Sequence, residues 1–347
     1  MEVLQVTSRK RETYEVDFTY SPLWECALGI AAITNSRLLN TLEKPINYWK
    51  DLRGKLSNNL IKHLKYVEEN NTWKAILQLL HRLESNTLNE FSTNVELLEN
   101  TKFKFICLPY IGENFEHLRE KAAVGDKNAI LELKAKTNES TFFPQYIEFL
   151  SKTDVKNLKA HLIEVMTLWF NEVISPELER ITQILQTDYE SKMKMKEKMS
   201  PEELVQWATG GINYLPEPSV YKVLLIPQYV YRPWTIEADI ENTKVFYYPV
   251  ANESLSPNDK YMPNIFLVLK HKALGDEIRL RIVKLLSKRD YSLHELTEQL
   301  DMSKTTIHHH LKILRGAKLV EINEGKYCLK ANVIEVLFKE LEQYINQ

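Results

Sequence analysis

Three helix-start signals follow one another near the C-terminus, and their order constrains the fold more than any other feature of the chain. Asp276 precedes an amphipathic run that ends near Leu286. Ser292 and Glu295 form a capping box, in which each residue satisfies a backbone amide at the start of a helix. Ser303 comes directly after a tight turn and begins a further amphipathic run. The sequence therefore predicts a helix, a short helix, a tight turn and a third helix.

A hairpin signal follows these helices. Residues 319–322 and 327–329 alternate between apolar and polar residues, and the sequence Asn-Glu-Gly-Lys lies between them. Three helices with a tight turn before the last one, followed by a hairpin, make up a winged helix-turn-helix domain. We expect this domain to cover residues 264–330.

The third helix of this predicted domain, from Lys304 to about Gly316, has two unlike faces. At about 100° per residue, its basic and polar side chains fall within about 140° of each other, and Ile307, His310, Leu311 and Leu314 fall opposite. A helix that enters the major groove of DNA needs this division, although a solvated helix in a bundle shows it too. The tight turn, the caps and the hairpin favour DNA. The predicted DNA contacts are Ser303, Lys304, Thr305, His308, His309 and Lys312, with Lys326 on the hairpin.

The net charge differs between this domain and the remainder of the chain. Residues 264–330 contain 13 Lys or Arg and 8 Asp or Glu, which gives +5, whereas the other residues carry −7. A basic domain on an acidic protein suggests a polyanionic partner. Lys326 stands beside Glu321 and Glu324, so we expect the hairpin to contact DNA only weakly.

Three consecutive histidines, His308 to His310, suggest a metal site at first sight. Successive helical residues point about 100° apart, so three in a row cannot close on one ion from one side. Cys26, Cys107 and Cys328 lie far apart and form no Cys-x-x-Cys pair. We therefore predict no metal site and no cofactor, and we expect His310 to be packed inside the domain.

Residues 270–330 resemble the DNA-binding domain of ArsR-type transcriptional regulators. The matching pieces are ALGDEIRLRI (273–282), LTEQLDMS (296–303), TIHHHLKILR (306–315) and AKLV (317–320), which lie within about a fifth of the chain. The resemblance implies a dimeric winged-helix protein that binds DNA, commonly a repressor released by an effector. The longer architecture is similar to a subset of these regulators that carries a large N-terminal domain of unknown ligand.

The metal sites of this family do not transfer to this chain. Metal-sensing members often carry Cys-x-Cys in the first helix of the helix-turn-helix, but residues 292–300 contain no cysteine. Another metal site of the family uses Asp and His on the C-terminal helix, and residues 332–346 contain neither.

The C-terminal segment, residues 331–347, is predicted to be an amphipathic helix with a wide apolar stripe. Two interpretations stay open: the stripe packs against its own domain, or it joins a dimer interface as the resemblance implies. The residues proposed for dimerisation are Val333, Leu337, Phe338 and Leu341.

The N-terminal three quarters of the chain predict a mainly helical body with little sheet, so the fold class is mainly α with minor β (α+β). Residues 1–215 are expected to be helical after a short β-hairpin within residues 3–19, with helix starts at Ser175-Pro176 and Ser200-Pro201. Residues 216–263 are Pro-rich and are expected to form short strands and a linker. The predicted strands cover residues 220–226, 229–231 and 244–248.

Aromatic side chains and one arginine gather in the second of these regions. They allow two interpretations, a site for an organic anion or a bridge between the two domains. The cluster comprises Tyr229, Tyr231, Arg232, Trp234, Tyr247 and Tyr248.

The chain shows no catalytic motif, no apolar signal segment and no run long enough to span a membrane. We therefore expect a cytoplasmic, homodimeric, sequence-specific regulator that binds double-stranded DNA as a repressor, with a small-molecule or protein effector on the body. Two alternatives stay open: an enzyme with an appended winged helix, or a protein-interaction body whose winged helix does not bind DNA.

Overall fold

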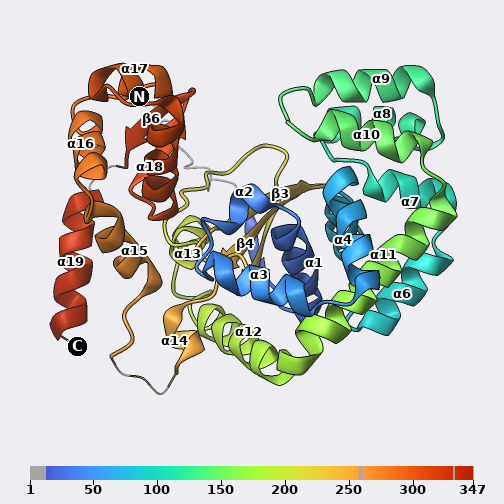
Figure 1. Ribbon diagram of the computed structural model, residues 1–347, viewed down its shortest axis with the longest axis horizontal. Coiled ribbons are helices and arrows are strands. Elements are labelled where there is room, and N and C mark those ends of the chain that lie inside the picture. Colours follow the sequence, from blue (N-terminus) through green and yellow to red (C-terminus); the bar gives the residue numbers. More distant parts are fainter. Residues whose placement is uncertain (1–12, 258, 260, 331–332, 347) are drawn as a thin grey trace, which may run out of the picture.

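A computed structural model describes residues 13–257, 259, 261–330 and 333–346 of the chain, and helices dominate it (Figure 1). A large body comes first, and a smaller domain formed by the C-terminal residues lies at one end of it. The predicted class, mainly α with minor β, is confirmed. The first arm of the predicted N-terminal hairpin lies outside the described residues.

Several helices of the body begin at polar caps that the sequence places before them. Ser21, Ser57, Asp126 and Asp154 each accept a hydrogen bond from a backbone amide in the first turn of a helix. The helices are α1 (Pro22–Ile33), α2 (Ser36–Leu39), α3 (Ile46–Lys55), α4 (Asn58–Asn70), α5 (Trp73–Arg82), α6 (Leu88–Leu97), α7 (Asn100–Cys107), α8 (Glu116–Ala123), α9 (Lys127–Lys136), α10 (Phe143–Lys152), α11 (Val155–Trp169), α12 (Leu178–Met193), α13 (Pro201–Ala208) and α14 (Asn252–Leu255).

A four-stranded sheet lies inside the body and joins its two ends in sequence. Strand β1 (Glu15–Phe18) pairs in parallel with β2 (Lys222–Gln228), which pairs in parallel with β4 (Thr243–Pro249). Strand β3 (Ile236–Ile240) pairs antiparallel with β4 at the other edge. The Pro-rich segment thus supplies three strands to the same sheet as the N-terminal strand.

Both faces of this sheet are buried, as is usual for parallel strands. Alternate residues of the central strands enter different cores because strand side chains point to opposite faces. Ile226 and Tyr247 join the large helical core, which contains Trp49 and Trp169. Leu225 and its neighbours on the other face pack on α13.

Two local predictions in the body are wrong. Residues 229–231 form a turn, not a strand, because Glu25 accepts the amides of Tyr229 and Val230 and holds that segment away from the sheet. The edge strand is β3 instead. Ser175 does not cap a new α-helix. It begins a single 3₁₀ turn, Ser175–Glu177, through which the π-turn that ends α11 continues into α12. Ser200 forms the predicted capping box.

The C-terminal domain has the predicted order of elements. It comprises α15 (Ile265–Leu274), α16 (Glu277–Leu286), α17 (Leu293–Leu300), α18 (Lys304–Gly316), β5 (Val320–Asn323), β6 (Lys326–Leu329) and α19 (Val333–Asn346). Its own apolar core includes Ile282, Leu296 and Leu311, all fully buried. The winged helix-turn-helix fold is confirmed.

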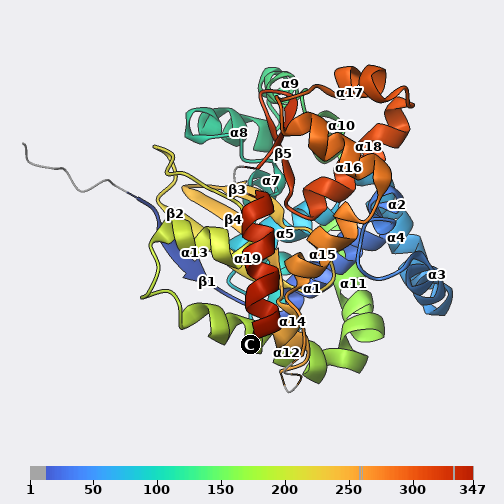
Figure 2. The same ribbon diagram turned by 90° about the vertical axis from the view of Figure 1, so that its left-hand side faces the viewer.

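The two parts of the molecule touch at the turn after α13 and at the end of α18. In Figure 2, α15 and α19 face the reader on the side of the body that carries α13 and α14. A Cβ at Gly210 would lie 2.0 Å from the ring of Phe266, and φ at Gly210 is +70°, so only glycine fits this approach. Lys330 donates to the carbonyl of Gly211 over 2.5 Å. The segment expected to be a linker contains the helix α14. The side-chain amide of Asn252, the first residue of this helix, donates a hydrogen bond to Pro263 O.

Candidate nucleic-acid interface

The turn between α17 and α18 is shaped by two residues with complementary roles. Asp301 adopts a left-handed conformation, φ +50°, and its amide donates to Thr297 O, which ends α17. Ser303 then begins α18, because its Oγ accepts the Thr306 amide at 3.2 Å. This geometry fixes the direction in which α18 leaves the turn, and it was predicted from the caps.

One stripe of α18 holds the helix in the domain. Ile307, Leu311 and Leu314 are fully buried and pack in the core with Ile282 and Leu296. Burying three large aliphatic side chains stabilises this position by several kcal/mol, at about 1.5–3 kcal/mol each. The helix is therefore a rigid support for whatever its other face presents.

The opposite face of α18 is polar and open at its N-terminal half. Lys304, Thr305, His308 and His309 are exposed, as is the capping residue Ser303. These five predicted DNA contacts therefore lie together at one end of the helix. In helix-turn-helix proteins the recognition helix reads base edges mainly with its N-terminal residues, and this is the open end of α18.

Lys312 lies one turn further and is half-buried. Burial and the nearby Arg315 guanidinium lower the pKa of its ammonium group. Arg315 itself is exposed on the same face, although it was not among the predicted contacts. Its angle around the helix relative to Lys304 is the signal that would have placed Arg315 among the predicted DNA contacts.

His310 points away from this face, as predicted. It is 13% exposed, and its Nδ1 lies 3.7 Å from the Asp276 carboxylate without forming a hydrogen bond. Burial lowers the pKa of its imidazole, and the Asp276 charge opposes that effect. His310 therefore packs between α18 and the start of α16 and presents nothing to a ligand of the open face.

The wing is short and carries little positive charge. Glu324 and Gly325 both have positive φ, +47° and +76°, which suits the two-residue turn of a twisted hairpin. Lys326 is exposed beside this turn, and so are Glu321 and Glu324. The wing can offer one ammonium group to a phosphate, against two carboxylates.

The C-terminal end of α18 is covered by the body. A Cβ at Gly316 would lie 3.0 Å from the indole ring of Trp234, whose Nε1 donates to Thr41 O at 3.1 Å. Of the two interpretations of the aromatic cluster, Trp234 fits the bridge between domains. Arg232 is 1% exposed and is occupied by Glu43, Val250 O and the Asn252 side chain. Its guanidinium is therefore held by groups of the protein itself and is not free to bind an organic anion.

The four residues predicted for dimerisation divide along α19. Val333 and Leu337 are buried within the chain, at 7% and 3% exposure. Leu341 is half-buried, and Phe338 is 65% exposed. The first pair thus packs against its own domain, and the second pair borders the solvent side of the helix.

The described residues lack two other kinds of site. Within residues 13–257, 259, 261–330 and 333–346, no group of three or more His, Cys, Asp or Glu side chains is placed to hold a metal ion. No helix in the same part of the chain has the length and apolar character needed to cross a membrane.

Comparison with known proteins gives matches to DNA-binding regulators. The family model described as bacterial regulatory protein, arsR family, matches residues 276–321. The transcriptional repressor SdpR of Bacillus subtilis (strain 168) is 30% identical over 90 residues, which cover 25% of this chain and 94% of that protein. The uncharacterized HTH-type transcriptional regulator MJ0229 of Methanocaldococcus jannaschii is 35% identical over 60 residues, 17% of this chain and 63% of that protein. No solved structure gives a significant match.

Proposed function

This chain belongs to the arsR family of bacterial regulatory proteins, and from that premise we propose that it is a transcriptional repressor that binds specific DNA sites as a homodimer. The family and both relatives support a DNA-binding transcriptional regulator. The step to a repressor draws on the name of the Bacillus relative, and the site of action is then the cytoplasm, where the DNA is.

The observation that carries this proposal is the open N-terminal half of α18. Lys304, Thr305, His308 and His309 form an exposed face that is backed by the buried stripe of the same helix. Side chains of this kind donate to phosphates and to base edges in the major groove. In a dimer, two such helices would read half-sites about one helical turn apart, or a small multiple of it.

Two further elements complete the proposal. The exposed Phe338 and the half-buried Leu341 on α19 supply the contact between protomers. The body, residues 1–263, holds an effector whose binding releases or restores DNA affinity, and it performs no catalysis of its own. An effector regulates only if it binds the DNA-competent and incompetent states with different affinity.

The experiment is a titration of the full chain with DNA from its own upstream region, at several salt concentrations. A scrambled duplex of equal length serves as the reference. We expect the native duplex to bind about 10³-fold more tightly. The double variant Lys304→Ala/Lys312→Ala should lose about 100-fold in affinity and lower the salt slope by about 2, since each lysine neutralises about one phosphate.

The matched control removes two exposed lysines at the opposite end of the body, Lys121 and Lys127 of the α8–α9 region (Figure 1). The control double variant should retain the affinity and the salt slope. Equal losses in both double variants would mean that net charge alone governs binding. Equal affinity for native, scrambled and genomic duplexes would favour the protein-interaction alternative.

The homodimer has its own test at Phe338. We expect Phe338→Ser to shift the chain toward monomer in sedimentation, because a large apolar side chain leaves the proposed interface. Leu280→Ser, which alters an apolar side chain of α16 that is 50% exposed, is the control and should leave the association unchanged. If Phe338→Ser dimerises as strongly as the parent, the interface does not involve this part of α19.

A further inference from the structure

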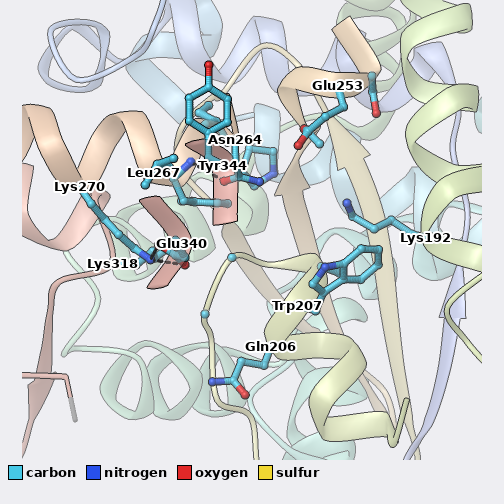
Figure 3. A pocket seen from close by; sticks show the side chains of 18 of the residues that line it. Lys192, Gln206, Trp207, Glu253, Asn264, Leu267, Lys270, Lys318, Glu340 and Tyr344 are labelled. Carbon is cyan, nitrogen blue, oxygen red and sulfur yellow. Dashed lines mark hydrogen bonds and ion pairs between the residues drawn. The ribbon is translucent and has the colours of Figure 1, made fainter. Parts of the chain in front are cut away.

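A cleft of about 680 Å³ lies where the body meets the winged helix. Its walls come from α12, α13 and α14 of the body and from α15, α19 and the residues that flank the wing. Figure 3 shows Lys192 and Trp207 approaching it from one side and Lys270, Lys318 and Glu340 from the other. The volume is in the range of small-molecule sites, and junctions between domains are common places for them.

Ammonium groups outnumber carboxylates in the walls of this cleft. Among the described residues, four lysines line it, against the two carboxylates of Glu253 and Glu340. Three of the lysines have partners within the protein. Lys270 forms an ion pair with Glu340 at 2.7 Å, Lys330 donates to Gly211 O, and Lys192 lies 3.9 Å from the buried Asp188 carboxylate.

Lys318 is the exception. Among the residues that the structure describes, its ammonium has no hydrogen bond and no ion pair, although the residue is half-buried and Nζ lies 6.0 Å from the Phe266 ring centroid. Burial, with the neighbouring Lys330 and Arg315, lowers its pKa to about 8, and Glu237 opposes this. A desolvated cation without a counterion is costly, and an incoming anion would remove that cost.

The cleft also has an apolar wall. Trp207 is 40% exposed and lies under Lys192, whose Nζ is 4.3 Å from its ring centroid. Phe266 and Tyr344 contribute aromatic surface on the side of the winged helix. A site that combines an unpaired cation with aromatic walls suits a ligand with a charged end and an apolar end.

We propose that this cleft binds a small organic anion with an aromatic or aliphatic part, and that its occupation changes the affinity of the winged helix for DNA. The regulatory half of this inference rests on the proposed function. The anion would pair with Lys318, and its apolar part would lie against Trp207.

The position of Lys318 connects the cleft to the DNA-binding face. Lys318 follows the last turn of α18 after Ala317, and Lys330 follows β6. An anion paired with Lys318 would lie at the end of α18, and its apolar part would reach the body at Trp207, which lines the same cleft. A ligand that fits one arrangement of the two parts better than another shifts the protein toward that arrangement.

The first test is isothermal titration of the full chain with 2-naphthoate and with 2-naphthamide, its neutral analogue of similar shape. We expect naphthoate to bind with a Kd below about 1 mM and naphthamide to bind at least about tenfold more weakly. Equal affinity for the two compounds, or no saturable binding of naphthoate, overturns the inference.

Two variants locate the binding within the cleft. Lys318→Gln should weaken naphthoate binding at least tenfold, since a charge-assisted contact is lost. Trp207→Leu, a change at a half-exposed side chain, should weaken naphthoate and naphthamide alike. The control Lys288→Gln removes an exposed lysine beyond the end of α16 and should have no effect. Unchanged affinity in both cleft variants overturns the inference even if naphthoate binds.

The second test measures DNA affinity with and without saturating naphthoate. We expect a change of about 5–150-fold, and the same factor in naphthoate affinity when DNA is present. Naphthoate binding without any change in DNA affinity overturns the regulatory half. A protein that binds naphthoate through Lys318 but prefers no DNA sequence refutes the proposed function and not the site. A protein that prefers its operator and ignores naphthoate refutes the site and not the proposed function.

Discussion

The winged-helix domain carries two groups of lysines that differ in what surrounds them. The outer group, Lys304, Lys312 and Lys326, lies on the open face of α18 and on the wing. The inner group lies in the cleft beside the body and comprises Lys270, Lys318 and Lys330. The net charge of +5 in residues 264–330 contains both groups, so charge counting alone overstates the surface that DNA can meet. The structure divides that charge between the face proposed for DNA and a junction within the protein.

The largest change in stability should come from removing the packing beneath the outer lysines. Leu311→Ala opens a cavity in a fully buried position of α18, and we expect a loss of about 2–5 kcal/mol in the free energy of unfolding of the domain. Operator affinity should fall with it. Urea denaturation measures the loss, and Leu280→Ala on the exposed side of α16 should stay within about 0.5 kcal/mol of the parent. A small loss in Leu311→Ala would mean that α18 is not held as described.

The next largest change in stability should come from the close contact between Gly210 and Phe266, at the junction where the inner lysines lie. Gly210→Ala places a methyl group against the Phe266 ring in a backbone conformation with φ +70°. We expect a loss of about 2 kcal/mol or more, of which about 1 kcal/mol is backbone strain. Gly325→Ala has a similar φ, +76°, and open space around it, so it should show the strain alone.

Thermal or urea unfolding of both glycine variants tests this difference. The added substitution Phe266→Leu should recover part of the loss in Gly210→Ala and none in Gly325→Ala. Equal losses in the two single variants would show that the approach of Phe266 costs nothing and that the junction can yield.

A third prediction concerns the pH dependence of stability. The pKa of Lys318 is lowered to about 8 by burial, whereas the unfolded chain holds this proton up to about pH 10.5. Between these values the unfolded state binds more protons, so Lys318 makes stability rise with pH, by about 1 kcal/mol per pH unit. Unfolding of the parent and of Lys318→Met from pH 7.5 to 10.5 should therefore give curves that differ in slope. Parallel curves would contradict the desolvation of Lys318, and naphthoate affinity should fall as pH passes 8.

The smallest effect should come from the wing. Lys326→Ala removes one exposed ammonium on a wing that also carries two exposed carboxylates, Glu321 and Glu324. We expect operator affinity to fall only about two- to fivefold, with a decrease of less than 1 in the salt slope. Fluorescence anisotropy at three salt concentrations resolves this. A loss as large as that of Lys304→Ala would place the wing beside α18 as an equal contributor.

Sequence reasoning succeeded where the signal is local. Asp276, Ser292 and Ser303 each cap the helix they were expected to begin, because a cap is set by residues within three positions of it. The open face of α18 also follows from local spacing. The turn at 229–231 was missed because it depends on Glu25, about 200 residues away.

The cleft lay beyond sequence reasoning for the same reason. Its walls come from segments between Ser191 and Tyr344 that no periodic pattern connects. Lys318 and Lys326 look alike in sequence, as basic residues beside short strands. Only the position of the body makes Lys318 a half-buried cation without an ion pair among the described residues and leaves Lys326 exposed to solvent.

The parallel pairing of β1 with β2 has a consequence for how the chain is made. The hydroxyl of Tyr14, beside β1, donates to the carbonyl of Tyr214, 200 positions later, so the sheet closes over a very long separation. Contacts between residues so far apart in sequence form slowly, and on the ribosome they cannot form until β2 has emerged. The winged helix follows the body in the chain and is built mainly from segments that are neighbours in sequence, which fold quickly. During synthesis the winged helix therefore emerges after all four strands of the body, so the sheet of the body can form first.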